Sequence, residues 1–200
     1  ECSFLLDNGS PVTGVVKCVY PCSSKYIVES KSIKLYFNSY NMTKVAADRD
    51  VAISSFENTA SEDLSKLLET EVKVAFQDGA RINNKYTSPN MEWDILDYIN
   101  VDLLEDQKDF IYDQYTEDPS LLVATQNSKY ETQKFYSGLL KSNCRVTSQP
   151  DWGDVFIHIR SKNTIDAHSI KKYIISYRDE CHFHEEICEC FYKRLKDAFD

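Results

Sequence analysis

The sequence predicts an α+β protein in which one unit, a β-hairpin followed by two helices, occurs twice. Near the start of the chain, two apolar runs flank a turn-forming segment, and the apolar residues then change to the spacing of amphipathic helices. The same order of elements returns in the second half, which indicates an internal duplication. We therefore expect two domains, residues 1–115 and residues 116–200.

The first half begins with two apolar runs, residues 3–6 and 12–20, on either side of the turn-forming segment Asp-Asn-Gly-Ser-Pro at 7–11. Ser30 or Ser32 can cap a following helix. Its apolar face comprises Ile33, Tyr36, Phe37 and Tyr40. A second helix is expected over about 48–68, and its apolar face comprises Ile53, Phe56, Ala60, Leu64 and Leu67. Alternation over residues 72–76 then predicts a strand.

Residues 92–118 form a strongly acidic stretch with interleaved apolar residues. A run of like charge is usually a solvated face. We expect an irregular connector that contains one strand and closes the first domain.

The second half is expected to contain a helix over 129–140, a strand over 144–147, a turn and a strand over 155–159. Two helices follow. Asn163 or Thr164 caps the first, whose face comprises Ile170, Tyr173, Ile174 and Tyr177. The second begins at about His184, and its face comprises Ile187, Phe191, Leu195 and Ala198.

Composition excludes several classes of partner. The formal net charge of −9 argues against binding to a phosphate backbone, which needs many Lys and Arg contacts. No apolar run approaches the roughly 20 residues of a membrane-spanning helix. Seven cysteines form an odd set without the spacing of a disulfide framework, which favours a reducing, cytoplasmic location.

The segment Lys-Ser-Asn-Cys-Arg-Val-Thr-Ser-Gln-Pro-Asp-Trp-Gly at 141–153 is the strongest candidate for an active site. The expected turn can fold Asp151 back toward Cys144. A thiolate is a nucleophile, and a nearby carboxyl group can move a proton to or from the reacting group. The alternative is structural: Cys144 as a small buried apolar residue and Asp151 as a turn former.

A second candidate lies between the last two expected helices. Cys181, His182, His184 and Cys188 could be a zinc set, although their spacing matches no finger or knuckle pattern. In a second interpretation, His184 and Glu185 open a helix and point into a cleft. In a third, this segment is an ordinary acidic first turn.

Three separated stretches together resemble one family. They are Val-Glu-Ser-Lys-Ser-Ile-Lys-Leu-Tyr at 28–36, Leu-Leu-Lys-Ser-Asn-Cys at 139–144 with Gln-Pro-Asp-Trp-Gly at 149–153, and Phe-His-Glu at 183–185. They are similar to the signatures of the NADPH-dependent 7-cyano-7-deazaguanine reductases of queuosine biosynthesis, the QueF family, in its long tandem-domain type. The resemblance implies tandem tunnelling-fold (T-fold) units, antiparallel sheets with helix pairs on one face.

The resemblance also implies roles for individual residues. Cys144 matches the nucleophile that forms a covalent thioimide with the nitrile, and Asp151 matches the acid that protonates the nitrile nitrogen. The positions that match substrate-binding residues are Val28, Glu29, Ser30, Phe183, His184 and Glu185. Ser30 and Lys31 match positions that contact NADPH, and no metal is implied.

The implied activity is four-electron reduction of the nitrile of 7-cyano-7-deazaguanine to an amine with two NADPH. The implied partners are this small-molecule substrate and a second copy of the chain in a homodimer, with no direct nucleic acid and no membrane. The alternatives are a non-redox T-fold relative that transfers an amine to the nitrile, and an inactive deazaguanine-binding module. Members of the long type extend beyond both ends of this chain. We therefore expect a piece of a longer protein, without the hairpin that closes the second domain.

Overall fold

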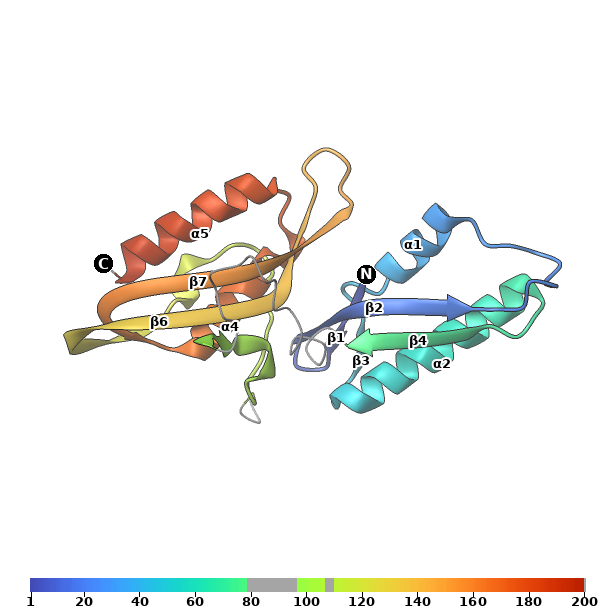
Figure 1. The fold of residues 1–200 in the computed structure, drawn as a ribbon, viewed down its shortest axis with the longest axis horizontal. Coiled ribbons are helices and arrows are strands. Elements are labelled where there is room, and N and C mark those ends of the chain that lie inside the picture. Colours follow the sequence, from blue (N-terminus) through green and yellow to red (C-terminus); the bar gives the residue numbers. More distant parts are fainter. Residues whose placement is uncertain (79–96, 107–109, 200) are drawn as a thin grey trace. The chain divides into compact units, whose positions relative to one another are not determined.

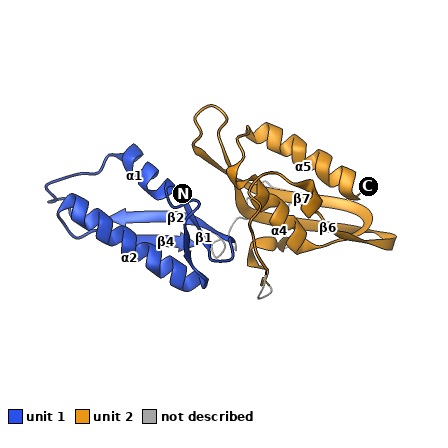
Figure 2. Cartoon of the chain, turned by 180° about the vertical axis from the view of Figure 1, so that it is seen from behind, with its two compact units in different colours: residues 1–84 blue, residues 85–200 orange. Residues whose placement is uncertain are grey.

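The computed structural model describes residues 1–78, 97–106 and 110–199 and divides the chain into two compact units, Glu1–Asn84 and Lys85–Asp200 (Figures 1 and 2). Each unit combines a β-sheet with helices, which confirms the α+β class. Both sheets are mixed rather than purely antiparallel, because each contains one parallel strand pair.

The sheet of the first unit has the strand order β3-β1-β2-β4. The predicted hairpin is confirmed as β1 (Cys2–Leu6) and β2 (Pro11–Val19), which pair antiparallel. The predicted strand after the helices is β4 (Lys73–Asp78), antiparallel to β2. The sequence did not indicate β3 (Lys44–Ala46), because three residues are too short to show an alternating pattern.

Both helices of the first unit are where the apolar spacing places them, α1 at Ser30–Asn38 and α2 at Arg49–Leu68. The expected cap of α1 was wrong, because neither Ser30 nor Ser32 is the N-cap residue. The N-cap is Glu29, whose carboxylate accepts a hydrogen bond from the Ser32 amide. On α2, Leu67 is exposed and Leu68 is buried, since the buried face advances by four residues from Phe56. These helices and the sheet share one core cluster, in which the rings of Phe4 and Phe56 stack with centroids 5.3 Å apart.

The sheet of the second unit has the order β5-β6-β7 and is dominated by one long hairpin, β6 (Ala124–Asn143) and β7 (Pro150–Ile165) (Figure 1). The strand expected over 155–159 is confirmed inside β7. The helix expected over 129–140 is wrong, because these residues belong to β6. Register shifts between Gln126 and Glu131 and between Ser137 and Leu140 interrupt the alternation of buried residues. The period of two that marks a strand is therefore hidden in the sequence.

The two helices after the hairpin are confirmed as α4 (Ala167–Ile175), which continues into the 3-10 turn η5 (Ser176–Asp179), and α5 (His184–Phe199). Asp166 caps α4 in place of the expected Asn163 or Thr164, which belong to β7. At the end of α5, Phe199 is buried and Ala198 is exposed, the reverse of the expected pattern.

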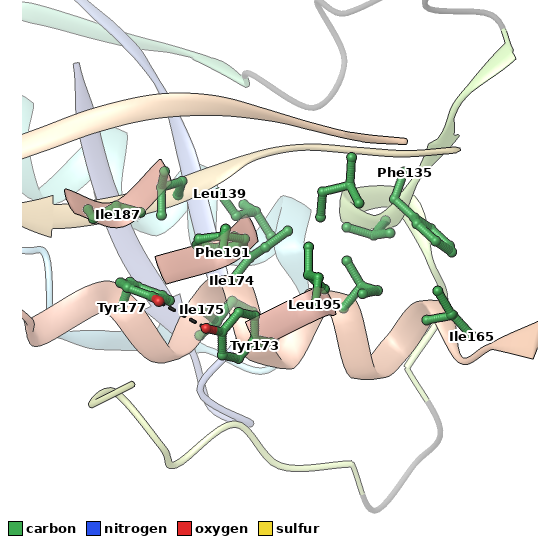
Figure 3. Packing of buried hydrophobic residues seen from close by; sticks show 14 of the residues in the cluster. Phe135, Leu139, Ile165, Tyr173, Ile174, Ile175, Tyr177, Ile187, Phe191 and Leu195 are labelled. Atoms are coloured by element: carbon green, nitrogen blue, oxygen red, sulfur yellow. Dashed lines mark hydrogen bonds between the residues drawn. The ribbon is translucent and has the colours of Figure 1, made fainter. Parts of the chain in front are cut away.

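The core of the second unit lies between the hairpin and these helices (Figure 3). Its centre is aromatic. Tyr177 stacks on Phe191 with ring centroids 4.9 Å apart, and the hydroxyl oxygens of Tyr173 and Tyr177 lie 2.9 Å apart. A hydrogen bond between the two hydroxyls thus keeps both of them partnered inside an apolar cluster, where an unpaired hydroxyl would be costly.

The boundary between the units differs from the expected one at residue 115. β5 (Ile99–Asn100) pairs with β6, and the Asp102 carboxylate accepts from the Ser137 hydroxyl at 2.6 Å and the Gly138 amide at 2.8 Å. Residues 97–106 therefore fold with the second unit. β5 is the strand expected within the acidic connector, whose residues 92–96 and 107–109 lie outside the described part.

Two global expectations can be compared with the described residues. Among these residues, no helix has the length and apolar character that crossing a membrane requires. No disulfide links any of the seven cysteines, all of which lie in the described ranges.

The packing of β2 leads to a stability prediction. Gly14 lies between β1 and β4, and a Cβ atom there would collide with the Gln77 carbonyl oxygen and the Phe76 ring. Gly14→Ala should lower the free energy of unfolding by about 1–3 kcal/mol, the usual cost of overpacking. Denaturant unfolding measures this loss.

Gly153→Ala in β7 is the matched control, because a Cβ there meets its nearest atoms at ordinary contact distances of 3.5 and 3.6 Å. Equal stability of the two variants would contradict the packing argument for Gly14.

Candidate active site

Cys144 directly follows β6 and opens a short loop to β7. The Cys144 amide donates to the Gln149 carbonyl at 2.8 Å, and the Ser148 amide donates to the Cys144 carbonyl at 2.8 Å. Ser148 has φ +54°, the left-handed conformation that closes such a turn. The strand expected over 144–147 is thus wrong, because these residues form the turn itself. Asp151 sits opposite Ser142 in the β6–β7 ladder, so the turn does bring Asp151 back to the end of β6 where Cys144 follows.

The loop favours the thiolate form of Cys144. Hydrogen bonds from the Thr147 hydroxyl, and then from the Thr147 and Val146 amides, hold the pKa of Cys144 below its usual value. Burial and the charge of Asp151 act in the opposite direction. Because the thiolate is the reactive form, this half-buried thiol has the surroundings of a nucleophile rather than of an inert core cysteine.

The carboxylate of Asp151 faces the imidazole of His184, the first residue of α5. Asp151 Oδ2 and His184 Nε2 are 3.4 Å apart. His184 Nε2 is shielded from solvent and has no hydrogen-bond partner among the described residues, so the contact has the distance of an ion pair without hydrogen-bond geometry. The ring nitrogen and the carboxylate can therefore both take part in proton transfer at this point.

Backbone hydrogen bonds fix the start of α5 beside the end of β6. The Asn143 amide donates to the Glu180 carbonyl at 2.7 Å, and the His182 amide donates to the Asn143 carbonyl at 3.1 Å. Asn143 and Cys181 form a parallel bridge. Cys144 and His184 each follow one of these paired segments, so residues 40 positions apart in the chain both start from this junction.

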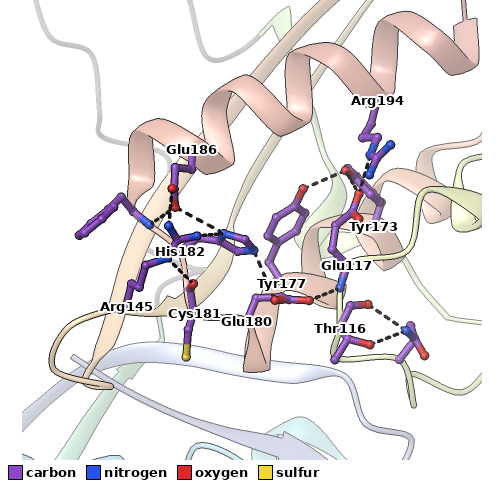
Figure 4. Close-up of polar contacts among 12 residues, drawn as sticks. Thr116, Glu117, Arg145, Tyr173, Tyr177, Glu180, Cys181, His182, Glu186 and Arg194 are labelled. Atoms are coloured by element: carbon purple, nitrogen blue, oxygen red, sulfur yellow. Dashed lines mark hydrogen bonds and ion pairs between the residues drawn. The ribbon is translucent and has the colours of Figure 1, made fainter.

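Side chains around this junction form a polar network that sequence analysis missed (Figure 4). The His182 ring lies between two carboxylates, with Nε2 3.3 Å from Glu180 Oε2 and Nδ1 3.5 Å from Glu186 Oε2. Arg145 reaches the same Glu186 from the Cys144 loop. The Glu180 side chain also accepts from the Glu117 amide at 2.9 Å. Charges of opposite sign at 145 and 186 are present in the sequence, but nothing local indicates that they meet.

The network continues to the core of the unit. Glu117 Oε1 accepts from the Tyr173 hydroxyl at 2.9 Å and from Arg194 Nε at 3.1 Å (Figure 4). Burial, followed by the contacts with Tyr177 and Glu117, raises the pKa of Tyr173 far above its usual value. Tyr173 therefore stays neutral and holds its place as a hydrogen-bond donor.

A groove of about 730 Å³ runs between β7 and α5 and begins at His184. Its apolar lining comes from residues such as Val155, Ile157, Ile187 and Phe191. Concave apolar surfaces with a few polar groups are where small ligands bind. The groove thus reaches the site of the His184–Asp151 contact.

The remaining predicted site residues divide between the units. Phe183 and Glu185 flank His184 and are exposed. Val28, Glu29, Ser30 and Lys31 belong to the first unit, at the start of α1. The structure therefore brings together five predicted residues, Cys144, Asp151, Phe183, His184 and Glu185, and describes the other four within their own unit.

In the first unit, Glu29 closes the N-terminus of α1. Its Oε2 accepts from the Ser32 amide at 2.8 Å and the Ser32 hydroxyl at 3.1 Å, and its Oε1 lies 3.3 Å from the Ser30 hydroxyl. The backbone amides of Lys31 and Ser32 are the main cause of a lowered pKa of Glu29. The carboxylate is thus charged and fixed in direction, while Oε1 keeps room for further donors.

The zinc interpretation has no support in this geometry. Across the described residues, no three or more His, Cys, Asp or Glu side chains are arranged to hold a metal ion. His182 contacts Glu180 and Glu186, whereas His184 contacts Asp151. The two candidate histidine ligands therefore serve different contacts.

Comparison with known proteins gives matches along most of the chain. A family model described as "Nitrile reductase, 7-cyano-7-deazaguanine-reductase N-term" matches residues 1–76, and one described as "QueF-like protein" matches residues 150–200. The second match covers Asp151 and the first turn of α5, and the first covers the start of α1.

Relatives in several bacteria carry one name, "NADPH-dependent 7-cyano-7-deazaguanine reductase". The protein of Colwellia psychrerythraea is 37% identical over 98% of this chain and 65% of its own length. That of Coxiella burnetii is 39% identical over 96% of this chain and 62% of its own length. The chain thus spans somewhat less than two thirds of these relatives.

A third relative, from Psychrobacter cryohalolentis, is 31% identical over 100% of this chain and 68% of its own length. The descriptions of both family models and the name of all three relatives point to the family that the three stretches of the sequence resemble. The chain belongs to the NADPH-dependent 7-cyano-7-deazaguanine reductase family.

Proposed function

We propose that this chain carries the catalytic site of a nitrile reductase, in which Cys144 attacks the nitrile of 7-cyano-7-deazaguanine. The observation that carries the proposal is the half-buried thiol whose pKa is lowered by its own loop, next to a carboxylate in contact with an imidazole. The name of the relatives supports the same substrate and the use of NADPH.

The chemistry requires this pairing of groups. A nitrile carbon is a poor electrophile until its nitrogen receives a proton. The sulfur of Cys144 forms a bond to the carbon, one π bond of the nitrile breaks, and its electron pair takes up a proton delivered by Asp151. The product is a neutral thioimide. Two further additions of hydride and proton give the primary amine and release the thiol, which accounts for four electrons and two NADPH.

We propose that the heterocycle is held by carboxylates. Glu185 and Glu29 can accept from its adjacent amino and ring N–H donors, and charged acceptors make the stronger hydrogen bonds. Phe183 offers an exposed ring for stacking, and His184 a ring nitrogen. Backbone groups at Val28 and Ser30 complete the proposed substrate contacts.

For NADPH, the proposed contacts are Ser30 and Lys31. Both side chains are exposed in the first turn of α1, and an ammonium group suits a phosphate. The backbone amides of Lys31 and Ser32 already donate hydrogen bonds to the Glu29 carboxylate at this helix N-terminus. The Lys31 side chain, rather than the helix end, would therefore attract the phosphate of NADPH. The cofactor supplies hydride when it is bound.

We also propose that each unit is a T-fold unit, the second carrying the catalytic Cys144. In support, both helices of each unit pack into one cluster with the sheet, as expected for a helix pair on one face. We further propose a cytoplasmic homodimer that acts on a small molecule and binds neither nucleic acid nor membrane. The net negative charge of the chain agrees with a small-molecule partner rather than a nucleic acid.

The covalent step can be tested directly. Incubation with 7-cyano-7-deazaguanine alone should add the mass of the ligand to the protein, because addition precedes reduction. Intact-mass spectrometry measures the adduct, and Cys144→Ala should abolish it. Cys188→Ala, which changes an exposed thiol on α5, is the control and should keep it.

An unchanged mass at saturating ligand in a folded sample would count against the mechanism. Adduct formation without any consumption of NADPH on adding the cofactor would instead favour a non-redox relative or a binding module.

Asp151→Asn tests the proton transfer. The amide has nearly the same shape, and the side chain is about half exposed, so the variant should fold normally. Loss of the acid should reduce the rate of NADPH consumption by about 10²–10⁴-fold. Turnover at the wild-type rate would mean that another group protonates the nitrile nitrogen.

Thr147→Val tests the activation of the thiol. Without the Thr147 hydroxyl the thiolate loses its main stabilising donor, so the pKa of Cys144 should rise. Since the thiolate is the reactive form, the pH dependence of alkylation of Cys144 by iodoacetamide should move to higher pH.

The matched control for this change is Thr132→Val, at an exposed position on β6, which should leave the profile in place. If the midpoint of the alkylation profile of Thr147→Val lies at or below that of the wild type, the hydroxyl does not stabilise the thiolate.

A further inference from the structure

One ion pair joins the loop that carries Cys144 to the helix that carries His184. Arg145 Nη1 and Glu186 Oε1 are 2.7 Å apart, although the residues are 41 positions apart in the chain (Figure 4). Arg145 directly follows Cys144, and Glu186 follows Glu185. The pair therefore links the neighbours of two proposed site residues.

Each partner makes additional contacts on the same side of the site. The Arg145 guanidinium lies 3.5 Å from the Cys181 carbonyl oxygen and from His182 Nδ1, and 5.7 Å from the centre of the Phe183 ring. Glu186 Oε2 accepts from the Phe183 amide at 3.0 Å. Arg145 and Glu186 thus hold Phe183 from two directions, one through its ring and one through its backbone.

The charge of Glu186 fits this arrangement. The Phe183 amide is the first cause of a lowered pKa of Glu186, and Arg145 and His182 act in the same direction. The carboxylate is therefore ionised at neutral pH, as pairing with a guanidinium requires.

We propose that Arg145 and Glu186 are positioning residues that hold the Cys144 loop against the start of α5. This inference rests on the proposed function, since it assigns the pair to the alignment of Cys144 with Asp151, His184 and Phe183. The pair touches neither substrate nor reacting atoms in this role, and acts through the loop.

Two observations favour positioning over a purely structural role. The side chains of Arg145 and Glu186 are 50% and 37% exposed, and ion pairs at such positions add little to global stability. The loop itself is exposed at its tip, where Val146 is 77% exposed, so its orientation depends on tethers such as Arg145. Displacement of a reacting group by about 1 Å can cost roughly 10²-fold in rate.

The experiment compares Arg145→Ala, Glu186→Ala and the double variant in the full chain. The first readout is the pH dependence of Cys144 alkylation by iodoacetamide, which needs no substrate. Electrostatics alone predicts opposite shifts, because removing Arg145 takes away a positive charge and removing Glu186 a negative one. Positioning predicts that both variants move the midpoint to higher pH, because each variant loosens the loop whose hydrogen-bond donors lower the pKa of Cys144. The charge of Asp151 raises this pKa and is left in place in both variants.

The second readout is the rate of covalent adduct formation with 7-cyano-7-deazaguanine. Each single variant should slow it by about ten-fold or more, and the double variant should be no slower than the singles, because the pair acts as a unit. Melting temperatures should stay close to that of the wild type. Lys73→Ala, which removes an exposed ion pair with Glu71 at 3.5 Å in the first unit, is the control and should change neither readout.

Opposite shifts of the two single variants, or adduct formation at the wild-type rate in all of them, would overturn the inference. If the wild-type protein forms no adduct, the proposed function fails. The alkylation profiles then still decide whether the pair orders the loop.

Discussion

The second unit depends on two backbone hydrogen bonds at Asn143, one on each side of that residue. Through its amide and its carbonyl, Asn143 binds the segment that leads into α5, so the end of β6 and the start of α5 have one fixed relation. Backbone bonds of this kind leave little freedom, because both partners belong to a strand and its parallel neighbour. This junction fixes the backbone segments that Cys144 and His184 directly follow.

Buried side chains reinforce the same junction. The Lys141 ammonium donates to the Arg178 carbonyl at 2.8 Å and to Asn143 Oδ1 at 2.9 Å. Burial, together with the charge of Arg178, lowers the pKa of Lys141 to about 8. A cation kept at such a place must have its donors satisfied, since an unpaired buried charge costs far more than a bond gains. The junction therefore combines backbone pairing with a buried cation that is held by hydrogen bonds to two oxygen atoms.

What sequence analysis could predict follows the range of the interactions involved. The β1–β2 hairpin, α2 and the start of α5 depend on turn residues and apolar spacing within one segment, and their prediction was correct. The long strand β6 was missed because its register shifts are set by pairing with β7 and not by its own residues. The N-cap of α1 is Glu29 rather than Ser30 or Ser32, because its longer side chain reaches the Ser32 amide from outside the helix.

The site shows the same division. Cys144 and Asp151 lie seven positions apart, and a turn was enough to predict that the chain folds Asp151 back toward the end of β6, where Cys144 follows. Arg145 and Glu186 required the packing of α5 against the end of β6, for which one sequence carries no signal. Nonlocal contacts of exposed side chains are therefore the part of a site that sequence reasoning finds last.

The chemistry of the site follows from a balance between attraction and repulsion at Cys144. Donors from Thr147 and Val146 favour negative charge on the sulfur, while Asp151 opposes it. In the proposed mechanism, the bond from the sulfur to the nitrile carbon removes the negative charge of the thiolate, and Asp151 donates a proton to the nitrile nitrogen. The carboxylate left on Asp151 then lies beside a neutral sulfur, so the proposed product avoids the repulsion between a thiolate and a carboxylate.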